Sequence, residues 1–425
     1  MQVIINPIRE NWNNIIKRPV INVSELNRTV QLVLDDVKVN GNRAVKKYTI
    51  EFDKVMLNHF SVTTEEMEEA EALLSDELKS AIQQAAANIK AFHAKQITPP
   101  EIIETMPGIE CWRKSVGIEK VGLYIPGGTA PLFSTILMLG IPAQLAGCTE
   151  IILCSPPAKD GKLNPAILYA ASVTGITKIF KIGGVQAIAA MAYGTETVSQ
   201  VYKIFGPGNQ YVTCAKQLIQ QQGIAIDMPA GPSEVCVWAD DSADASFIAA
   251  DLLSQAEHGA DSQVLFVCNK EEMGENVLAA IAKQLKELPR QGFAMNALEN
   301  SKIIVMENNE DALDLINMYA PEHLIISCKN DEQLAERIVN AGSVFLGNYS
   351  PESVGDYASG TNHTLPTNGF AKAYSGVSVD SFVKKITFQK LTQHGLQNIA
   401  SAVIKMAEAE GLQAHANAVR VRMQK

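Results

Sequence analysis

The feature that most constrains the fold is an alternation of short β-rich runs with helical stretches, which begins after Lys120. The runs are Val121–Ile125, Glu150–Cys154, Lys178–Ile182, Gln200–Phe205, Val235–Trp238, Gln263–Cys268, Lys302–Met306, His323–Cys328 and Ser343–Leu346. Several runs end in a Gly or Pro turn that leads into a helix. This alternation predicts βαβ units, largely parallel sheets and an α/β protein. Ligands in such sheets are expected beyond the carboxyl ends of the strands, at helix N-termini.

The two ends of the chain do not show this alternation. Residues 1–19 predict a short helical arm, and Val23–His93 is expected to be mostly helical. Thr63 and Glu66 form a capping box at one helix start. A buried face is predicted from apolar residues that recur at spacings of four and three, namely Leu78, Ile82, Ala85, Ile89 and Phe92. The last 45 residues or so predict a helical tail.

Composition narrows the class of protein. A length of 425 residues is enough for two or three domains at roughly 100–200 residues each. The net charge of −10, with no run of Lys and Arg, argues against a nucleic-acid partner. The largely apolar stretch Thr129–Cys154 is interrupted by prolines, glycines and polar residues, so it predicts a buried helix and a buried strand and not a membrane span.

Cysteine usage and the start of the chain indicate a cytoplasmic protein. The seven cysteines are scattered and form no CxxC pair, which is typical of reduced, mostly buried thiols. Met1–Trp12 lacks the apolar core of a signal peptide.

Three glycine-rich turns each close a β-rich run and open a helix: Pro126-Gly127-Gly128, Gly183-Gly184 and Gly206-Pro207-Gly208. Glycine allows close approach of the backbone to a ligand, and the helix N-terminus behind it favours phosphate. A GxGxxG fingerprint and a Walker A motif are absent, and any one of these turns is usually only a turn. Three together predict a dinucleotide site, since each lies next to a side chain that could reach a nucleotide: Tyr124, Gln186 or Asn209.

Two short motifs carry groups suited to metal binding and proton transfer. Gln255 and His258 are three residues apart at the end of a helix, so both can reach one cation such as zinc, although this spacing is more often structural. Glu322-His323 precedes the buried run Leu324–Ile326. A histidine suits general base work near neutral pH and a neighbouring Glu can activate water; a salt-bridged turn is the alternative.

The remaining polar positions are less specific. Asp356 and His363 flank a loop dense in hydrogen-bonding groups, and such loops usually lie on the surface. Glu410 and His415 lie on a helical segment that resembles a solvated face. The other histidines, His59, His93 and His394, are expected to be surface or packing residues. Spacing alone does not assemble these groups into one site.

Taken together, the motifs resemble the histidinol dehydrogenase family from about residue 115 to the end. The matching segments are Val121–Gly128, Ile204–Asn209, Asp227–Glu234, Asp251–Gly259, Pro321–Leu324, Ser350–His363 and Glu410–Asn417. The resemblance implies NAD-dependent oxidation of L-histidinol through its aldehyde to L-histidine, with one zinc ion per subunit. It further implies a homodimer in which two incomplete Rossmann-like domains form the body and the C-terminal tail crosses to the partner.

The resemblance also assigns roles to residues. It implies zinc ligands at Gln255, His258, Asp356 and His415, and a catalytic acid–base pair at Glu322 and His323. Substrate contacts are implied for the zinc ligands and for Ser233, His323, His363 and Glu410. The NAD site would hold Tyr124, Gln186 and Asn209. The implied domains are an arm at 1–19, a first α/β domain of 20–123 with 235–377, a second, NAD-binding domain at 124–234, and a tail at 378–425.

Three other interpretations remain at this point. A paralogue on the same scaffold could oxidise another small polar alcohol, although Glu410, His363 and both metal histidines favour histidinol. A non-catalytic zinc or nucleotide-binding protein is disfavoured by the intact Glu322-His323. A cysteine thiolate could oxidise an aldehyde, but Cys148 and Cys154 flank an apolar run without a neighbouring His or cationic residue, so they are expected to be buried and inert.

Overall fold

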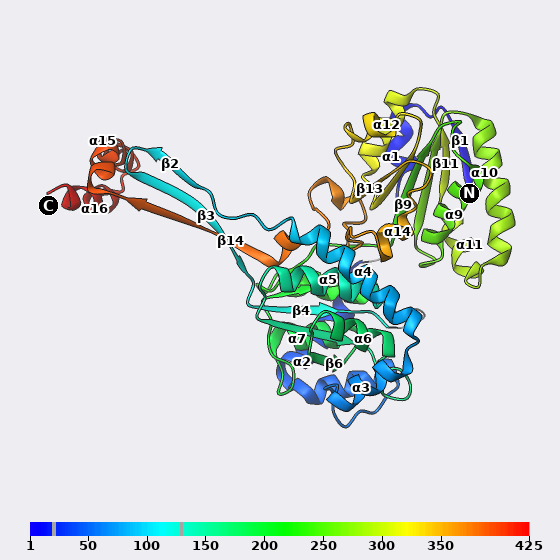
Figure 1. Ribbon diagram of the computed structural model, residues 1–425, viewed down its shortest axis with the longest axis horizontal. Helices are drawn as coiled ribbons and strands as arrows, with labels where there is room; N and C mark the ends of the chain where they lie inside the picture. The colour runs from blue at the N-terminus through cyan, green and yellow to red at the C-terminus, as the bar shows by residue number, and fades with distance from the viewer. Residues whose placement is uncertain (19–22, 128–130, 425) are drawn as a thin grey trace.

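The computed structural model describes residues 1–18, 23–127 and 131–424, which form two α/β bodies and a projecting arm (Figure 1). The first body is built on a six-stranded parallel sheet in the order β1-β11-β10-β9-β12-β13. Its strands are β1 (Gln2–Ile5), β9 (Glu234–Ala239), β10 (Gln263–Cys268), β11 (Lys302–Val305), β12 (His323–Ser327) and β13 (Ser343–Leu346). Both faces of this sheet are covered by helices, as parallel sheets require.

The central strand β9 shows how the two faces are filled. Val235, Val237 and Ala239 pack in one hydrophobic cluster, while Cys236 and Trp238 pack in the cluster on the opposite face. The helices of the first cluster are α9 (Ala245–Ala256), α10 (Glu271–Gln284) and α11 (Gln291–Glu299). The helices of the second are α1 (Trp12–Ile15), α12 (Asn309–Tyr319) and α13 (Asp331–Ala335).

The second body is built on a five-stranded parallel sheet in the order β6-β5-β4-β7-β8. Its strands are β4 (Lys120–Tyr124), β5 (Glu150–Ser155), β6 (Lys178–Lys181), β7 (Lys203–Phe205) and β8 (Ala225–Ile226). One face packs against α2 (Val23–Tyr48), α7 (Gly184–Tyr193) and α8 (Gln210–Gln220). The other packs against α3 (Thr64–Leu73), α4 (Asp76–Ala94), α5 (Ser134–Leu145) and α6 (Pro165–Val173).

The arm is a three-stranded antiparallel ribbon that ends in two helices. Its strands are β2 (Ile102–Met106), β3 (Ile109–Gly117) and β14 (Val383–Leu391), with β3 in the centre. The helices α15 (Gln393–Ala409) and α16 (Gln413–Met423) pack on each other at the tip. Figure 1 shows the arm extending away from both bodies, with the C-terminus at its far end.

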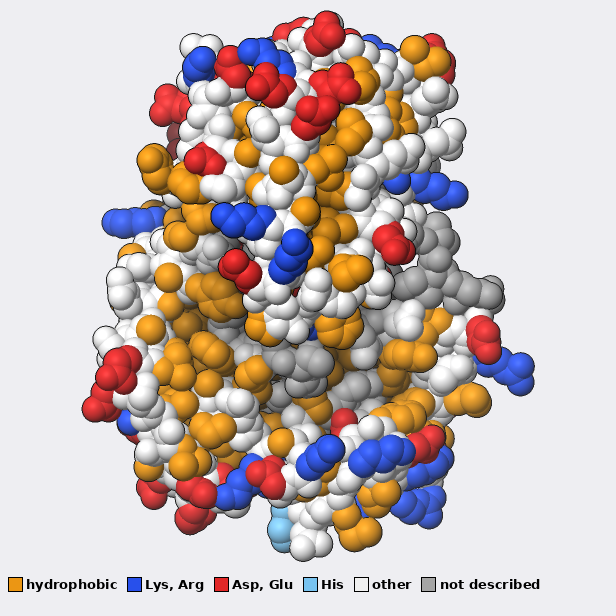
Figure 2. Space-filling view, turned by 90° about the vertical axis from the view of Figure 1, so that its right-hand side faces the viewer, with side chains coloured by type: hydrophobic (Ala, Val, Ile, Leu, Met, Phe, Trp, Pro, Cys, Tyr) orange, Lys and Arg blue, Asp and Glu red, His pale blue; other side chains and the backbone are white. Residues whose placement is uncertain are grey.

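Short elements complete the chain. They are η1 (Arg9–Asn11), a π-helical turn η2 (Thr49–Asp53), η3 (Leu285–Glu287), α14 (Glu352–Tyr357), η4 (Phe370–Lys372) and η5 (Val379–Phe382). Within the described residues, no helix is both long enough and apolar enough to cross a membrane. On the side of the molecule away from the arm, Lys and Arg are interspersed with Asp and Glu and form no continuous basic field (Figure 2).

The predicted α/β class with mainly parallel sheets is confirmed, and every predicted β-rich run contains a strand. The capping box of Thr63 and Glu66 is present. The apolar stretch forms α5 and β5 as expected, although Thr129, like Gly128, lies outside the described residues. On α4 the predicted face is buried at Ile82, Ala85 and Ile89, but Phe92 remains 49% exposed.

Three segments differ from the predictions. Residues 1–19 are not simply a helical arm, because Val3, Ile4 and Ile5 pair with β11 as an edge strand. The tail at 378–425 is not wholly helical, because it contains β14, whose seven inner residues are all exposed and so show no burial pattern. The helices of residues 23–94 pack on the second body, whereas the sequence assigns residues 20–123 to the first α/β domain. The reason is that hydrophobic periodicity identifies the buried face of a helix but not the sheet on which that face packs.

Candidate active site

Glu322 and His323 lie at the amino end of β12, and both are buried, with 7% and 3% of their surface exposed. Gln255 reaches the same place from the last turn of α9. Asp356 comes from α14, in the polar loop region that follows β13. This cluster therefore forms at the amino edge of the six-stranded sheet, not at the carboxyl edge that parallel topology predicts.

The backbone of Glu234, the first residue of β9, joins the members of this cluster. Its N–H donates to Glu322 Oε2 at 2.8 Å. Its carbonyl oxygen lies 3.3 Å from Gln255 Nε2, from which it accepts, and 3.2 Å from His323 Nδ1. The carbonyl favours a proton on Nδ1, whereas the amide donor Gln255 Nε2, which lies 3.2 Å from the same nitrogen, favours an unprotonated Nδ1, so both tautomers of a neutral His323 have a partner here.

The carboxylates around His323 favour its protonated form, and a proton can be shared between His323 and these carboxylates. Burial alone would lower the pKa of His323, but Glu322, Asp356 and Glu352 together raise it. Burial raises the pKa of Glu322, against the opposing effect of His323. Asp356 Oδ1 lies 3.3 Å from His323 Nε2. A proton accepted at Nε2 is therefore stabilised by a carboxylate beside it.

Two oxygens in the cluster suit a metal ion. Gln255 Oε1 and Asp356 Oδ1 are buried, and neither accepts a hydrogen bond. The amide nitrogen of Gln255 is already bound to the Glu234 carbonyl, which leaves the oxygen free to act as a ligand. Buried orphan acceptors are costly unless a cation or donor satisfies them. The donor set thus fits the expected zinc, with His258 nearby at the C-terminal end of α9.

The fourth expected ligand lies elsewhere. His415 and Glu410 are exposed near the junction of α15 and α16, at the tip of the arm. Over the part of the chain that the structure describes, no cluster of three or more His, Cys, Asp or Glu side chains forms a metal site. Of the four expected ligands, Gln255 and Asp356 lie in the cluster and His258 lies near it.

Of the predicted substrate residues, Ser233 lies beside the cluster and His363 lies between the two bodies. Ser233 directly precedes Glu234, and its carbonyl accepts from Gln263 N at 3.2 Å. His363 Nε2 lies 3.5 Å from Thr135 Oγ1 on α5, so His363 touches the second body. Burial lowers the pKa of His363 despite the opposing effect of Asp356, which favours a neutral imidazole.

The predicted nucleotide residues surround a cavity of about 950 Å³ at the carboxyl edge of the five-stranded sheet. Tyr124 and Asn209 line it, together with Gly127 and Gly184. The N-termini of α7 and α8 both open onto the cavity, which favours an anionic group. Two of the three glycine turns contribute lining residues; Gly128 itself lies outside the described residues.

Hydrogen bonds fix the side chains around this cavity. Tyr124 Oη accepts from Gly184 N at 3.1 Å, and Asn209 Oδ1 caps α8 by accepting from Tyr211 N and Val212 N at 3.1 Å. Gln186 is fully buried behind the cavity, donates to Asp53 at 3.2 Å and keeps Oε1 without a partner. At Gly206, with φ of +123°, a Cβ would lie 2.0 Å from the Tyr124 carbonyl, so only glycine fits this turn.

Sequence reasoning missed several residues of the two sites. Glu234 was recognised only as the end of a motif, and Arg18, which binds its carboxylate, gave no signal in a segment expected to be helical. Glu352, whose pKa burial raises to about 8, and Asp53, whose pKa burial raises to about 6, also escaped notice. A lone carboxylate is usually solvated, and only the fold shows that these are buried.

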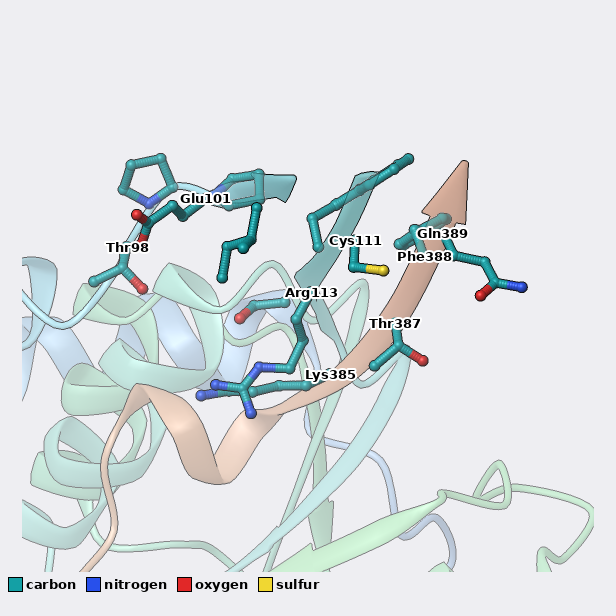
Figure 3. Close-up of a pocket in the computed structure, with 13 residues that line it drawn as sticks. Thr98, Glu101, Cys111, Arg113, Lys385, Thr387, Phe388 and Gln389 are labelled. Atoms are coloured by element: carbon teal, nitrogen blue, oxygen red, sulfur yellow. The ribbon is translucent and has the colours of Figure 1, made fainter. Parts of the chain in front are cut away.

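The cysteines and the arm offer no rival site. Burial raises the pKa of Cys148 to about 11 and raises that of Cys154 still further, so neither thiol is poised as a thiolate, although Cys148 is partly exposed. A second cavity of about 840 Å³ lies on the arm, where Figure 3 shows Cys111, Arg113 and Lys385 on neighbouring strands. It contains none of the predicted site residues.

Two parallel sheets, one with a buried Glu–His cluster and one with a cavity at helix N-termini, define a two-domain α/β enzyme. The family model described as histidinol dehydrogenase matches residues 16–423. The chain is 58% identical to the histidinol dehydrogenase of Bacteroides thetaiotaomicron over 423 residues, which is 100% of this chain and 99% of that protein. It is 51% identical to that of Vibrio cholerae, over 97% and 95% of the two chains.

A solved structure agrees with these relatives. The crystal structure of histidinol dehydrogenase from Elizabethkingia anophelis superposes with a TM-score of 0.98 at 56% identity, covering 100% of this chain and 98% of that one. The chain belongs to the histidinol dehydrogenase family, a family of oxidoreductases.

Proposed function

We propose that the protein is a zinc- and NAD-dependent L-histidinol dehydrogenase, which oxidises L-histidinol through L-histidinaldehyde to L-histidine. The observation that carries this proposal is the buried cluster of Glu322, His323, Gln255 and Asp356 around one backbone peptide. It combines an acid–base pair with free metal-ligand oxygens in a member of this family. The reaction belongs to histidine biosynthesis.

Gln255, His258 and Asp356 would hold zinc in one subunit, and His415 of a second copy would complete the set. When both are bound, zinc orients the substrate and stabilises charge, and NAD accepts hydride. Tyr124, Gln186 and Asn209 would hold NAD at the 950 Å³ cavity. The support is that two helix N-termini and an orphan Gln186 oxygen converge there.

The first oxidation needs a base for the alcohol proton. His323 Nε2 is suited to this task, since it has no hydrogen-bond partner among the described residues and lies 3.3 Å from Asp356 Oδ1. As the C–H bond gives up its hydride, the hydroxyl proton moves to Nε2, and the adjacent Asp356 carboxylate stabilises the imidazolium. The products of this step are the aldehyde, the reduced cofactor and one proton. A positioned base typically contributes about 10²–10⁴-fold in rate.

The second oxidation needs water to add to the aldehyde first. Glu322 accepts the proton of that water. Once His323 has passed its first proton to solvent, the hydrate loses its hydride while His323 takes the remaining hydroxyl proton. The raised pKa of Glu322 suits it to gain and return a proton near neutral pH. Overall, two hydrides and the corresponding protons leave the substrate, one water is consumed, and a carboxylate forms.

The active protein would be a homodimer with composite sites. His415 and Glu410 lie at the tip of an arm that projects from its own bodies, and both are exposed. The arm also exposes the apolar residues Ile102, Ile103 and Phe388, an unfavourable arrangement for an isolated chain. Insertion of each arm into a second copy would cover these residues and deliver His415 and Glu410 to the other site.

The first experiment is NADH formation by absorbance with L-histidinol, using protein stripped of metal and then reloaded with zinc. Two NADH per histidinol, lost on stripping and restored by zinc, would support the proposal. A folded, zinc-loaded dimer that does not turn over histidinol refutes it. A panel of other amino alcohols then tests the alternative, a paralogous dehydrogenase of another small polar alcohol.

A further inference from the structure

Arg18 makes a bidentate contact with a buried carboxylate next to the catalytic cluster. Its Nε lies 2.5 Å from Glu234 Oε1, and its Nη2 lies 2.8 Å from Glu234 Oε2. The side chains are 16% and 3% exposed. A planar guanidinium held at both nitrogens fixes the orientation of the carboxylate more tightly than a point charge does.

Arg18 is itself held in place by the first body. Its Nη2 donates to the Tyr319 carbonyl at 2.8 Å, and the guanidinium lies 4.0 Å from the centre of the Tyr319 ring. The Tyr319 hydroxyl donates to Gln263 Oε1, and Gln263 Nε2 donates to the Lys17 carbonyl at 3.1 Å. The segment that carries Arg18 is therefore fastened to the start of β10.

Glu234 transmits this anchoring to the catalytic groups through its own peptide. Its N–H binds Glu322 and its carbonyl binds both Gln255 and His323. A rotation of the Glu234 backbone would disturb all three contacts together. The carboxylate of Glu234 also accepts from Asn368 N at 2.9 Å, but among the residues that the structure describes only Arg18 bonds to both of its oxygens.

We propose that Arg18 is a positioning residue, which acts through the Glu234 peptide to hold Glu322 and His323 in place. This inference rests on the proposed function for the roles of Glu322 and His323. Arg18 reaches these groups through Glu234, and the nucleotide cavity lies on the other sheet, so its effect should appear in kcat and not in the KM for NAD.

The test compares R18M, R18K and a matched control, K181M. Lys181 forms an ion pair of 2.8 Å with Glu66, with 10% and 20% of the side chains exposed, and belongs neither to the catalytic cluster nor to the residues that line the nucleotide cavity. All variants are assayed as zinc-loaded protein well below their melting temperatures. R18M should lose on the order of 10²-fold in kcat, as expected for a misplaced catalytic group. R18K should recover part of that loss, and K181M should keep the kcat of the parent protein.

A second measurement is independent of turnover. In protein labelled with ¹⁵N-histidine, the imidazole signals report the surroundings of each ring, and H323N identifies the signals of His323. The parent protein should show one set of His323 signals, and R18K should shift or broaden that set, because the contacts of the Glu234 peptide with His323 loosen. This result decides the inference even if histidinol is not the substrate, and it uses R18K in case R18M does not fold.

The outcomes separate the two proposals. A parent protein that is inactive on histidinol refutes the proposed function, and the imidazole signals of His323 still test Arg18. An R18M protein that melts earlier but retains kcat, with the His323 signals unchanged in R18K, shows that the ion pair is only structural and overturns the inference.

Discussion

The position of His415 leads to a quantitative prediction about mixed dimers. Strands β3 and β14 are nine residues long, and at roughly 3.3 Å per residue the ribbon spans about 30 Å before α15 begins. His415 therefore cannot reach Gln255 of its own chain while the arm stays extended. A site assembled from two chains should consequently be restored by mixing two inactive variants.

The perturbation is a pair of single substitutions, H323A and H415A. Each alone should lose at least about 10²-fold in kcat, since one removes the proposed base and the other a proposed zinc ligand. In a heterodimer, one site combines His323 of one chain with His415 of the other and is intact, while the second site carries both changes. Random 1:1 reassociation gives half heterodimers, so about a quarter of the parent activity should return.

The assay uses two affinity tags and tandem purification after co-expression, followed by NADH formation. The purified heterodimer should have about half the parent activity per dimer, because one of its two sites works. A mixture of separately purified homodimers, before exchange, serves as the control. Heterodimers that are proven by both tags yet no more active than that control would refute the composite site, as would full activity of H415A.

Three further predictions follow from the structure. Burial raises the pKa of Asp53 to about 6, so the stability that its protonated form provides is complete below about pH 4 and is lost as the pH rises through 6. D53N should raise the melting temperature more at pH 8 than at pH 5, by an equivalent of about 1–2 kcal/mol after solvent screening; equal shifts at both values would contradict this. Replacement of Cys148 or Cys154 by Ser should leave kcat intact, and iodoacetamide should not lower the kcat of the parent protein, since burial raises the pKa of both thiols. N209A should raise the KM for NAD and, through the lost cap of α8, cost about 1 kcal/mol in thermal unfolding; an unchanged KM would remove Asn209 from the nucleotide site.

The strands and helices of the two bodies could be predicted because their signals are local. Runs such as Gln263–Cys268 are continuous and apolar, and the structure gives β10 the same bounds. The pairing of strands that lie far apart in the sequence, such as β14 with β3, left no comparable signal. β14 alternates Lys, Thr and Gln with Ile and Phe, but both of its faces are exposed in one chain, so no buried side identifies it as a strand.

The same limit applies to the site. Glu322-His323 was recognisable because two ionisable groups precede a buried run, but the sequence suggested the carboxyl edge of the sheet and the cluster lies at the amino edge. That position follows from α9, whose last turn returns Gln255 to the start of β12. The role of the Glu234 peptide was not accessible, because it depends on three backbone contacts that residue types do not encode.

The pairing of β1 with β11 has a consequence for how the polypeptide is made. Gln2 is aligned with Lys302, so β1 is synthesised about three hundred residues before its partner strand β11 exists. Meanwhile the second body, whose strands lie between Lys120 and Ile226, can assemble first. Contacts of such large sequence separation close slowly. During synthesis, the β-forming residues Val3, Ile4 and Ile5 therefore remain without their partner strand until the six-stranded sheet closes.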